Sequence, residues 1–284
     1  LTLGIAGAGA MGRGIAQIAA QAGVRVLLFD LAPGAAAAAR DTIAATLSAL
    51  AAKGKIDPAA AEAAAARIEP VAALEAFAPC HIVVEAIIEK LEAKRQLFIA
   101  LENIVAGDCI LASNTSSLSV TEIAAACRRP GRVAGYHFFN PVPLMKVVEV
   151  IDALLTEPWV GEALTGLARR MGHTPVRAKD TPGFIVNRCA RCYLTYALRL
   201  FGENVAEFYE IDRILRETAG FRMGPFELLD LTGLDVSQPV MESIYHQYYQ
   251  DPRYRPSPIA AQRLAAGLLG RKSGRGFYSY EAPN

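Results

Sequence analysis

The chain has 284 residues, a length that fits one large domain or two ordinary ones, and 52% of them are hydrophobic. That content is sufficient for a sizeable core. The formal net charge of +1 gives no overall electrostatic field, which argues against nucleic acid or an anionic membrane as the main partner. No signal peptide and no run of about 18 apolar residues is present, so we expect a cytoplasmic protein.

The five cysteines are an odd number without disulfide-like spacing, which is typical of reduced thiols in a cytoplasm. Cys189 and Cys192 form a CxxC pair. Zinc would need a second pair or nearby histidines, and none is close in the sequence, so we predict no metal site. Because the segment has the pattern of a continuous apolar helix, we expect both cysteines to be buried.

From the N-terminus, short apolar runs typical of strands alternate with helical segments. Strands are expected at Leu3–Ala6, Val24–Phe29, Ile82–Val84, Ile110–Ala112, Arg132–Tyr136, Val147–Ile151 and Thr174–Arg177. Helices are expected at Ile15–Ala22, Ala35–Ala52, Pro58–Arg67, Leu91–Val105, Val120–Ala126 and Val160–Met171. This alternation predicts an α/β fold with a doubly wound, mainly parallel sheet and helices on both faces.

The pattern changes at Pro182-Gly183, the strongest break in the chain. Only helices are expected after it: Phe184–Phe201, Ile211–Ala219, Pro225–Leu231, Val236–Tyr249 and Ile259–Ala266. We therefore predict two domains, residues 1–183 and an all-α domain of residues 184–284.

A glycine-rich turn follows the first expected strand and opens a helix. Gly7, Gly9 and Gly12 have GxGxxG spacing, and Asp30 ends the next strand, which is the context of a Rossmann-like dinucleotide site. Glycine lets the turn be tight, lets the backbone approach a pyrophosphate, and lets helix and strand pack closely. The helix N-terminus would face the phosphates. The expected contacts of the turn are Gly7, Gly9, Ala10, Met11 and Gly12. Asp30 would bind the adenosine ribose and repel a 2′-phosphate, which favours NAD over NADP.

Polar residues lie just past later strands, where a doubly wound sheet binds its ligands. Ser116 follows one strand, His137 ends the next, and Glu149 is the one acidic residue of Lys146–Ile151. A buried carboxylate needs a partner, and His137 is the obvious one. A histidine held by a carboxylate can take a proton from an alcohol while a nicotinamide takes the hydride, which suggests an alcohol-to-ketone dehydrogenase. From spacing alone, a structural core histidine fits about equally well.

Three runs resemble the L-3-hydroxyacyl-CoA dehydrogenase family: ASNTSSL at 112–118, HFFNPVPLMKVVE at 137–149 and DTPGFIVNR at 180–188. The resemblance continues through Gly224–Asp235 and Gly270–Tyr278 and so covers almost the whole chain. It implies NAD-dependent, reversible oxidation of an L-3-hydroxyacyl-CoA to the 3-oxoacyl-CoA, as in the β-oxidation of fatty acids. The helical half most resembles bacterial members from phenylacetate degradation, which act on 3-hydroxyadipyl-CoA.

The resemblance also implies roles. His137 would be the general base, Glu149 would orient it, and Ser116 would hydrogen-bond the substrate oxygen. Asn187 would bind the carbonyl region of the substrate when the domains close. The family positions that contact the cofactor match Asp30, Glu89, Lys94, Ser116, Asn140 and Lys272, and those assigned to CoA match Thr46, Lys53 and Ser116.

Some of these positions have simpler explanations. Taken alone, Glu89 and Lys94 fit an exposed salt bridge on a helix better than a ribose site. Lys53 could equally be an ordinary charge at the end of a helix.

Two other functions stay open. A dehydrogenase of the same fold acting on a non-CoA 3-hydroxy acid or sugar acid would need no lysines near residue 53. Enzymes of the 6-phosphogluconate type use a lysine where this chain has Asn187. A crystallin-like NAD-binding protein would have lost catalysis, which an intact polar set argues against. The resemblance also implies a homodimer formed through the helical domain, where Tyr245, Tyr248 and Tyr249 cluster.

Overall fold

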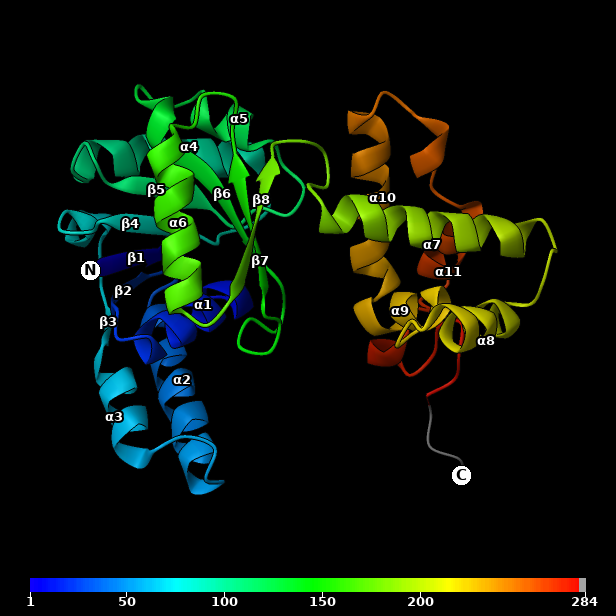
Figure 1. Cartoon of the computed structure of the whole chain (residues 1–284), viewed down its shortest axis with the longest axis horizontal. Helices are drawn as coiled ribbons and strands as arrows, with labels where there is room; N and C mark the ends of the chain where they lie inside the picture. Colours follow the sequence, from blue (N-terminus) through cyan, green and yellow to red (C-terminus); the bar gives the residue numbers. More distant parts are fainter. Residues whose placement is uncertain (281–284) are drawn as a thin grey trace. The chain divides into compact units, whose positions relative to one another are not determined.

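The computed structural model describes residues 1–280. The chain divides into two compact units, Leu1–Phe184 and a second one that begins at Ile185. Figure 1 shows a sheet with its helices in the first unit and helices in the second. Among the described residues, no helix is both long enough and apolar enough to cross a membrane.

The first unit contains one sheet, which within residues 1–280 has 8 strands in the order β3-β2-β1-β4-β5-β6-β7-β8. The strands are β1 (Thr2–Ala6), β2 (Arg25–Phe29), β3 (Ile68–Pro70), β4 (Ile82–Glu85), β5 (Ile110–Ser113), β6 (Val133–Phe138), β7 (Val147–Asp152) and β8 (Thr174–Lys179). The order reverses between β1 and β4, and doubly wound sheets bind ligands in the crevice outside such a point.

The seven predicted strands are present, and the structure adds one, β3. The short β3 was not expected, because its three residues form no apolar run; it extends the sheet by pairing with β2. All neighbouring strands are parallel except β6 and β7, which are antiparallel. Only residues 139–146 connect these two strands, which is too short for the crossover that a parallel pair requires.

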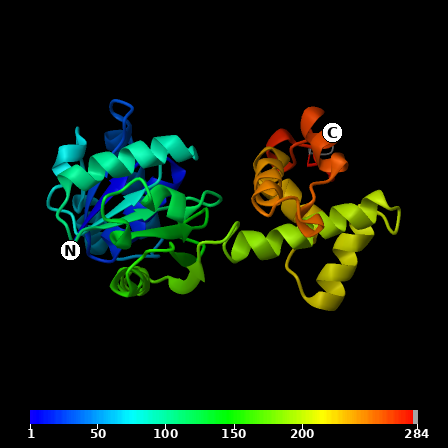
Figure 2. The same cartoon turned by 90° about the horizontal axis from the view of Figure 1, so that it is seen from above.

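Helices cover both faces of the sheet, as Figure 2 shows from above. Their bounds are α1 (Ala10–Gln21), α2 (Ala35–Ala52), α3 (Pro58–Ala66), α4 (Leu91–Ile104), α5 (Val120–Ala124) and α6 (Pro158–Arg170), with one-turn helices η1 (Leu74–Phe77) and η2 (Pro130–Arg132). One apolar core lies under α1, α2, α3 and α6, and the other under α4 and α5. Successive strand residues contribute to opposite cores, as the pleat requires.

The second unit, within the described residues, is helical. Its elements are α7 (Val186–Gly202), α8 (Phe208–Ala219), α9 (Pro225–Thr232), α10 (Leu234–Gln247), α11 (Pro258–Ala265), η3 (Pro252–Tyr254) and η4 (Arg271–Ser273). Edge-to-face rings pack its core around Phe226. The carboxylate of Asp230, 1% exposed, accepts hydrogen bonds from the backbone N–H groups of Phe277 and Tyr278 at 2.9 Å each and so fastens the C-terminal segment to α9.

The expectation that both α7 cysteines are buried is wrong. Cys189 is exposed and Cys192 is half-buried. The buried face of α7 contains Leu194, Ala197 and Leu198, and at 100° per residue Cys189 falls on the opposite side of the helix. Residues 1–280 contain no group of three potential metal-ligating side chains.

Candidate active site

The turn between β1 and α1 has the geometry that its glycines predict. Gly7 has φ +108°, a conformation that side chains strongly disfavour. A Cβ added at Gly12 would collide with the carbonyl oxygen of Gly7, so α1 can pack on the turn only with glycine there. A Cβ added at Gly9 would meet nothing within 4 Å. The turn is therefore closely packed where Gly12 meets Gly7, and it is open on the side of Gly9.

The N-terminus of α1 fits a dinucleotide pyrophosphate. Gly9 caps the helix without a side-chain hydrogen bond, and the first turn, which holds Ala10 and Met11, has no acidic residue. Its N–H groups and the positive end of the helix dipole are thus directed at the open space over Gly9, where an anion is favoured.

Asp30 lies beside this turn, just past β2. Its Oδ2 accepts a hydrogen bond from the backbone N–H of Ala8 at 2.7 Å, and its Oδ1 accepts one from the N–H of Ala32 at 2.9 Å. These contacts fix the carboxylate next to the glycine turn. A carboxylate so placed suits a ribose diol and opposes a 2′-phosphate.

His137 and Glu149 are brought together by the antiparallel pairing of β6 and β7, in which they are direct register partners. Nδ1 of His137 lies 2.6 Å from Oε2 of Glu149. Both side chains are buried, at 5% and 0% exposure, and the imidazole packs against the rings of Phe139 and Phe184. With Nδ1–H donating to the carboxylate, the lone pair of the imidazole is on Nε2.

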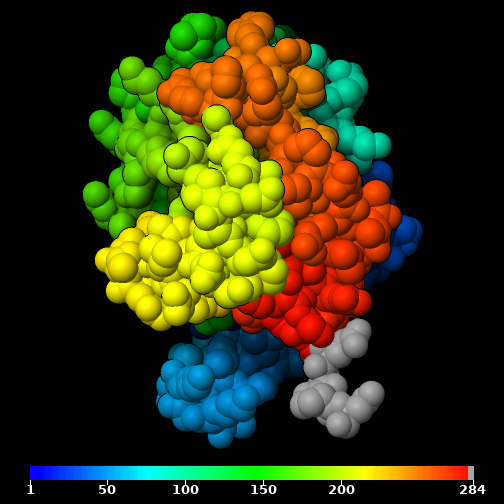
Figure 3. Space-filling view, turned by 90° about the vertical axis from the view of Figure 1, so that its right-hand side faces the viewer, coloured from blue at the N-terminus to red at the C-terminus, as the bar shows by residue number. Residues whose placement is uncertain are grey.

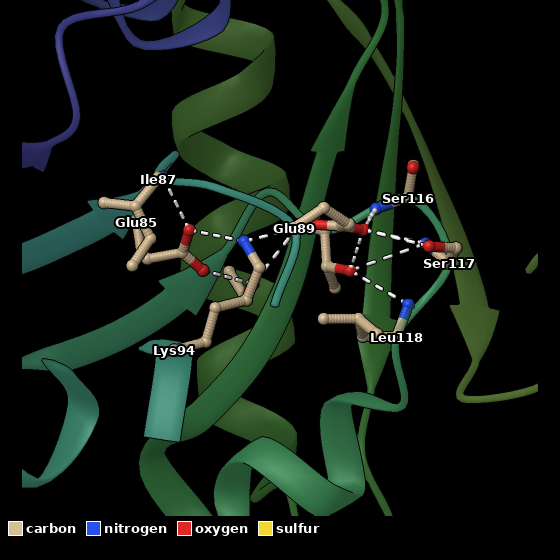
Figure 4. A network of polar contacts seen from close by, with 9 residues as sticks. Glu85, Ile87, Glu89, Lys94, Ser116, Ser117 and Leu118 are labelled. Atoms are coloured by element: carbon tan, nitrogen blue, oxygen red, sulfur yellow. Dashed lines mark hydrogen bonds and ion pairs between the residues drawn. The ribbon is translucent and has the colours of Figure 1, made fainter. Parts of the chain in front are cut away.

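The loop after β5 carries Ser116 and is tied to its surroundings by Glu89. The carboxylate Oε1 of Glu89 accepts hydrogen bonds from the Thr115 hydroxyl at 2.6 Å and from the Ser116 N–H at 2.9 Å (Figure 4). Burial raises the pKa of Glu89, but the Lys94 ammonium and these donors outweigh it and hold that pKa below its usual 4.5. The same donors that hold the loop therefore favour the ionised form of Glu89.

Lys94 is not the exposed helix lysine that sequence alone favoured. Its side chain is 1% exposed, and Nζ lies 3.2 Å from Oε2 of Glu89. The ammonium also contacts Glu85, which is fully buried at the end of β4. Sequence reasoning missed Glu85, although it is the one acidic residue of its strand. It also missed Asn114, whose Oδ1 accepts the N–H of Phe138 at 2.9 Å and joins the Ser116 loop to β6.

Two of the remaining predicted residues line one small pocket of about 160 Å³ between α1, α2 and the loop after β6. Thr46 and Asn140 contribute to it, and so does Arg13, which sequence reasoning did not select. Lys53 is exposed at the C-terminal end of α2. A cationic side chain near small polar groups is suited to phosphate.

Two predicted residues belong to the second unit. Asn187 lies in the first turn of α7, where its Oδ1 accepts a hydrogen bond from Nη2 of Arg191 at 3.2 Å. Arg191 is 9% exposed, and burial lowers its pKa to about 10. Lys272, on η4, pairs with Asp235 at 2.6 Å.

The fold and the glycine turn define the class of protein: a Rossmann-like protein that binds a dinucleotide. Residues 2–181 match the family model of the 3-hydroxyacyl-CoA dehydrogenase NAD binding domain, and residues 183–280 match that of the 3-hydroxyacyl-CoA dehydrogenase C-terminal domain. The chain therefore belongs to the 3-hydroxyacyl-CoA dehydrogenase family, and its cofactor is NAD.

Individual proteins of the family are similar over nearly the whole chain. The 3-hydroxyadipyl-CoA dehydrogenase of Escherichia coli K12 is 44% identical over 281 residues, which are 99% of this chain and 59% of that protein. A probable 3-hydroxybutyryl-CoA dehydrogenase of Deinococcus radiodurans is 43% identical over 99% of this chain and 100% of its own length. The crystal structure of 3-hydroxybutyryl-CoA dehydrogenase from Escherichia coli K12 superposes with a TM-score of 0.97 at 43% identity, covering 100% of this chain and 60% of that one. The chain thus spans about three fifths of the Escherichia coli proteins and all of the Deinococcus protein.

Proposed function

We propose that this protein catalyses the NAD-dependent, reversible oxidation of an L-3-hydroxyacyl-CoA to the 3-oxoacyl-CoA. The observation that carries this proposal is the buried His137–Glu149 pair, with Nδ1 and Oε2 2.6 Å apart, on the sheet that also holds the NAD turn. A base held by a carboxylate in a low-dielectric site, next to a hydride acceptor, is what alcohol oxidation needs.

Each of the four polar side chains has a separate role in this reaction. NAD, when bound at the glycine turn, supplies the hydride acceptor. Nε2 of His137 takes the proton of the 3-hydroxyl group, and Glu149 stabilises the imidazolium that results, as a carboxylate partner does in other histidine bases. Ser116 hydrogen-bonds the substrate oxygen and Asn187 binds near the thioester carbonyl. In the reverse direction the protonated His137 returns its proton to the 3-oxo group.

The CoA part of the substrate is assigned to the small pocket between α1 and α2 and to the C-terminal end of α2. Thr46 lines the small pocket with Arg13 and Asn140, and Lys53 ends the same helix. Arginine and lysine are the usual partners of phosphate groups. This cationic arrangement favours a CoA thioester over a free hydroxy acid, which would have no phosphates to place there.

For the acyl group, we propose the 3-hydroxyadipyl-CoA of phenylacetate catabolism, because the helical half resembles family members that act on it and a protein named for it is 44% identical. The names of the relatives support either this substrate or 3-hydroxybutyryl-CoA. NADH oxidation with acetoacetyl-CoA and with 3-oxoadipyl-CoA decides between them: a higher kcat/KM for the adipyl thioester supports the proposal, and a preference for acetoacetyl-CoA contradicts it. A cytoplasmic location is part of the same proposal.

We also propose a homodimer formed through the second unit. A groove of about 1060 Å³ runs between α7, α8 and residues 252–259, and Figure 3 shows this face, with α7 in yellow-green. Tyr196 of α7 contributes to its lining and is 62% exposed, and Ile211 and Leu215 of α8 also line it. A groove lined by apolar residues with an exposed aromatic side chain is typical of subunit interfaces. A monomeric mass by light scattering at micromolar concentration would contradict the dimer.

A further inference from the structure

Lys94 is a buried cation held between two carboxylates of unequal exposure. Its Nζ lies 2.5 Å from Oε1 of Glu85 and 3.2 Å from Oε2 of Glu89 (Figure 4). The side chain of Glu85 is 0% exposed and that of Glu89 is 37% exposed. An ammonium withdrawn from water needs a fixed counter-charge nearby. The buried Glu85 is the fixed counter-charge of Lys94, whereas the partly exposed Glu89 has room to change its orientation.

Glu85 is itself immobilised from two sides. Its Oε1 accepts the N–H of Ile87 at 2.7 Å, and its Oε2 accepts the hydroxyl of Ser113 at 2.6 Å. Glu85 and Ser113 are register partners in β4 and β5, so the contact is built into the sheet. The carboxylate therefore presents a defined oxygen to Lys94.

Glu89 connects this ion-pair network to the loop after β5 through hydrogen bonds. In addition to Thr115 and Ser116, its Oε1 accepts the Ser117 N–H at 3.2 Å and the Ser117 hydroxyl at 3.1 Å. One carboxylate oxygen thus accepts hydrogen bonds from three consecutive residues. If Glu89 turned toward solvent, these donors would lose their common acceptor.

We propose that Glu85 is a positioning residue for Ser116: it anchors the Lys94 ammonium, which orients Glu89, which fixes the backbone of residues 115–117. Glu85 contacts neither substrate nor cofactor in this scheme. The link from Ser116 to catalysis rests on the proposed function, whereas the link from Glu85 to the loop does not. Small displacements of a positioned group of about 1 Å can lower turnover about 100-fold, so the arrangement matters for rate as well as for stability.

The test is Glu85→Gln, which keeps the shape and removes the charge. We expect faster amide hydrogen exchange at Ser116 and Ser117 and a kcat lowered about 10- to 100-fold, with the KM for the acyl-CoA changed much less. Glu102→Gln is the matched control: Glu102 is another buried carboxylate of the first unit, on the same helix as Lys94, and it accepts backbone N–H groups at residues 128 and 129. Its loss should leave the exchange of residues 116 and 117 and kcat unchanged.

A double-substitution cycle tests the route through Lys94. If Glu85 acts through the ammonium, Glu85→Gln should have little further effect in a Lys94→Met background, whereas independent effects would add. Additive effects, or unaltered exchange at Ser116 and Ser117 in Glu85→Gln, would overturn the proposal.

If the Gln variant does not fold, Glu85→Asp, which keeps the charge but shortens the reach, should give the same exchange signature, and its absence would equally overturn the proposal. Hydrogen exchange reports on the loop without any turnover. Altered exchange in a protein inactive toward CoA thioesters would therefore contradict the proposed function and support this inference.

Discussion

His137 and Glu149 face each other across two antiparallel strands, with Nδ1 and Oε2 2.6 Å apart and neither side chain more than 6% exposed. Direct register partners project to the same face of the sheet, so the two side chains are neighbours. The antiparallel pairing of β6 and β7 is therefore what positions the imidazole beside the carboxylate.

The first prediction concerns the base. In His137→Gln we expect NADH to bind with nearly unchanged affinity, because the glycine turn is untouched, while kcat falls by about two to four orders of magnitude. Fluorescence titration and steady-state kinetics measure the two quantities. Turnover that stays unchanged would remove His137 from the mechanism.

The second prediction concerns cofactor choice. Asp30→Ala should weaken NAD binding and reduce the discrimination against NADP, since it removes both the ribose acceptor and the charge that repels a 2′-phosphate. The ratio of kcat/KM for the two cofactors is the measurement. If the ratio does not change, a residue other than Asp30 distinguishes the ribose of NAD from that of NADP.

The third prediction concerns CoA. Lys53→Ala should raise the KM for an acyl-CoA about two- to fivefold with little change in kcat, as expected for one exposed ion pair. A pantetheine thioester, which lacks the nucleotide phosphates, serves as control and should show no difference between variant and parent protein. Equal effects on both substrates would place Lys53 elsewhere in the mechanism.

The fourth prediction concerns how the order of the Ser116 loop depends on pH. The pKa of Glu89 is held below its usual 4.5, so its ionised form stabilises the folded state above that pH, and the stabilisation is lost as the pH falls through the lowered pKa. Lys94→Met removes a cause of the lowering and should move the acid loss of loop order to higher pH. Hydrogen exchange of Ser116 against pH shows this directly, and coincident curves for the two proteins would contradict it.

The fifth prediction concerns the second unit. Asp230→Ala leaves the N–H groups of Phe277 and Tyr278 without their acceptor, which should lower the free energy of unfolding by about 2–5 kcal/mol. Glu203→Gln, in an exposed pair with Arg199, should cost less than about 1 kcal/mol. Denaturant unfolding followed by circular dichroism compares them. Equal losses would mean that the tail is not held through Asp230.

The sequence was sufficient for the regular parts of the fold. The alternation of apolar runs predicted the sheet, and the alanine-rich α2 ends where Lys53 and Gly54 interrupt it. The sequence was insufficient where tertiary contacts determine the direction of a strand or the burial of a side chain. The direction of β7 depends on a connection length rather than on strand composition, and the burial of Lys94 depends on Glu85, which lies on another element. The exposure of Cys189 follows from which face of α7 packs, and that is also a tertiary property.

The candidate site divides in the same way. GxGxxG spacing carries its own mechanism, so Gly7, Gly9 and Asp30 could be selected from local pattern alone. His137 and Glu149 could be paired only as a hypothesis, because many buried histidines are structural. Glu85, which pairs with Lys94, gave no motif, since a single glutamate at a strand end has many uses.

The most direct test of the account is NADH oxidation by the purified protein with acetoacetyl-CoA and with free acetoacetate. We predict turnover with the thioester alone, and its loss in His137→Gln. Turnover with the free acid would show that CoA is not required and would favour the non-CoA dehydrogenase. Absence of turnover with both compounds, and with 3-oxoadipyl-CoA, would contradict the enzymatic function and leave an NAD-binding protein without catalysis.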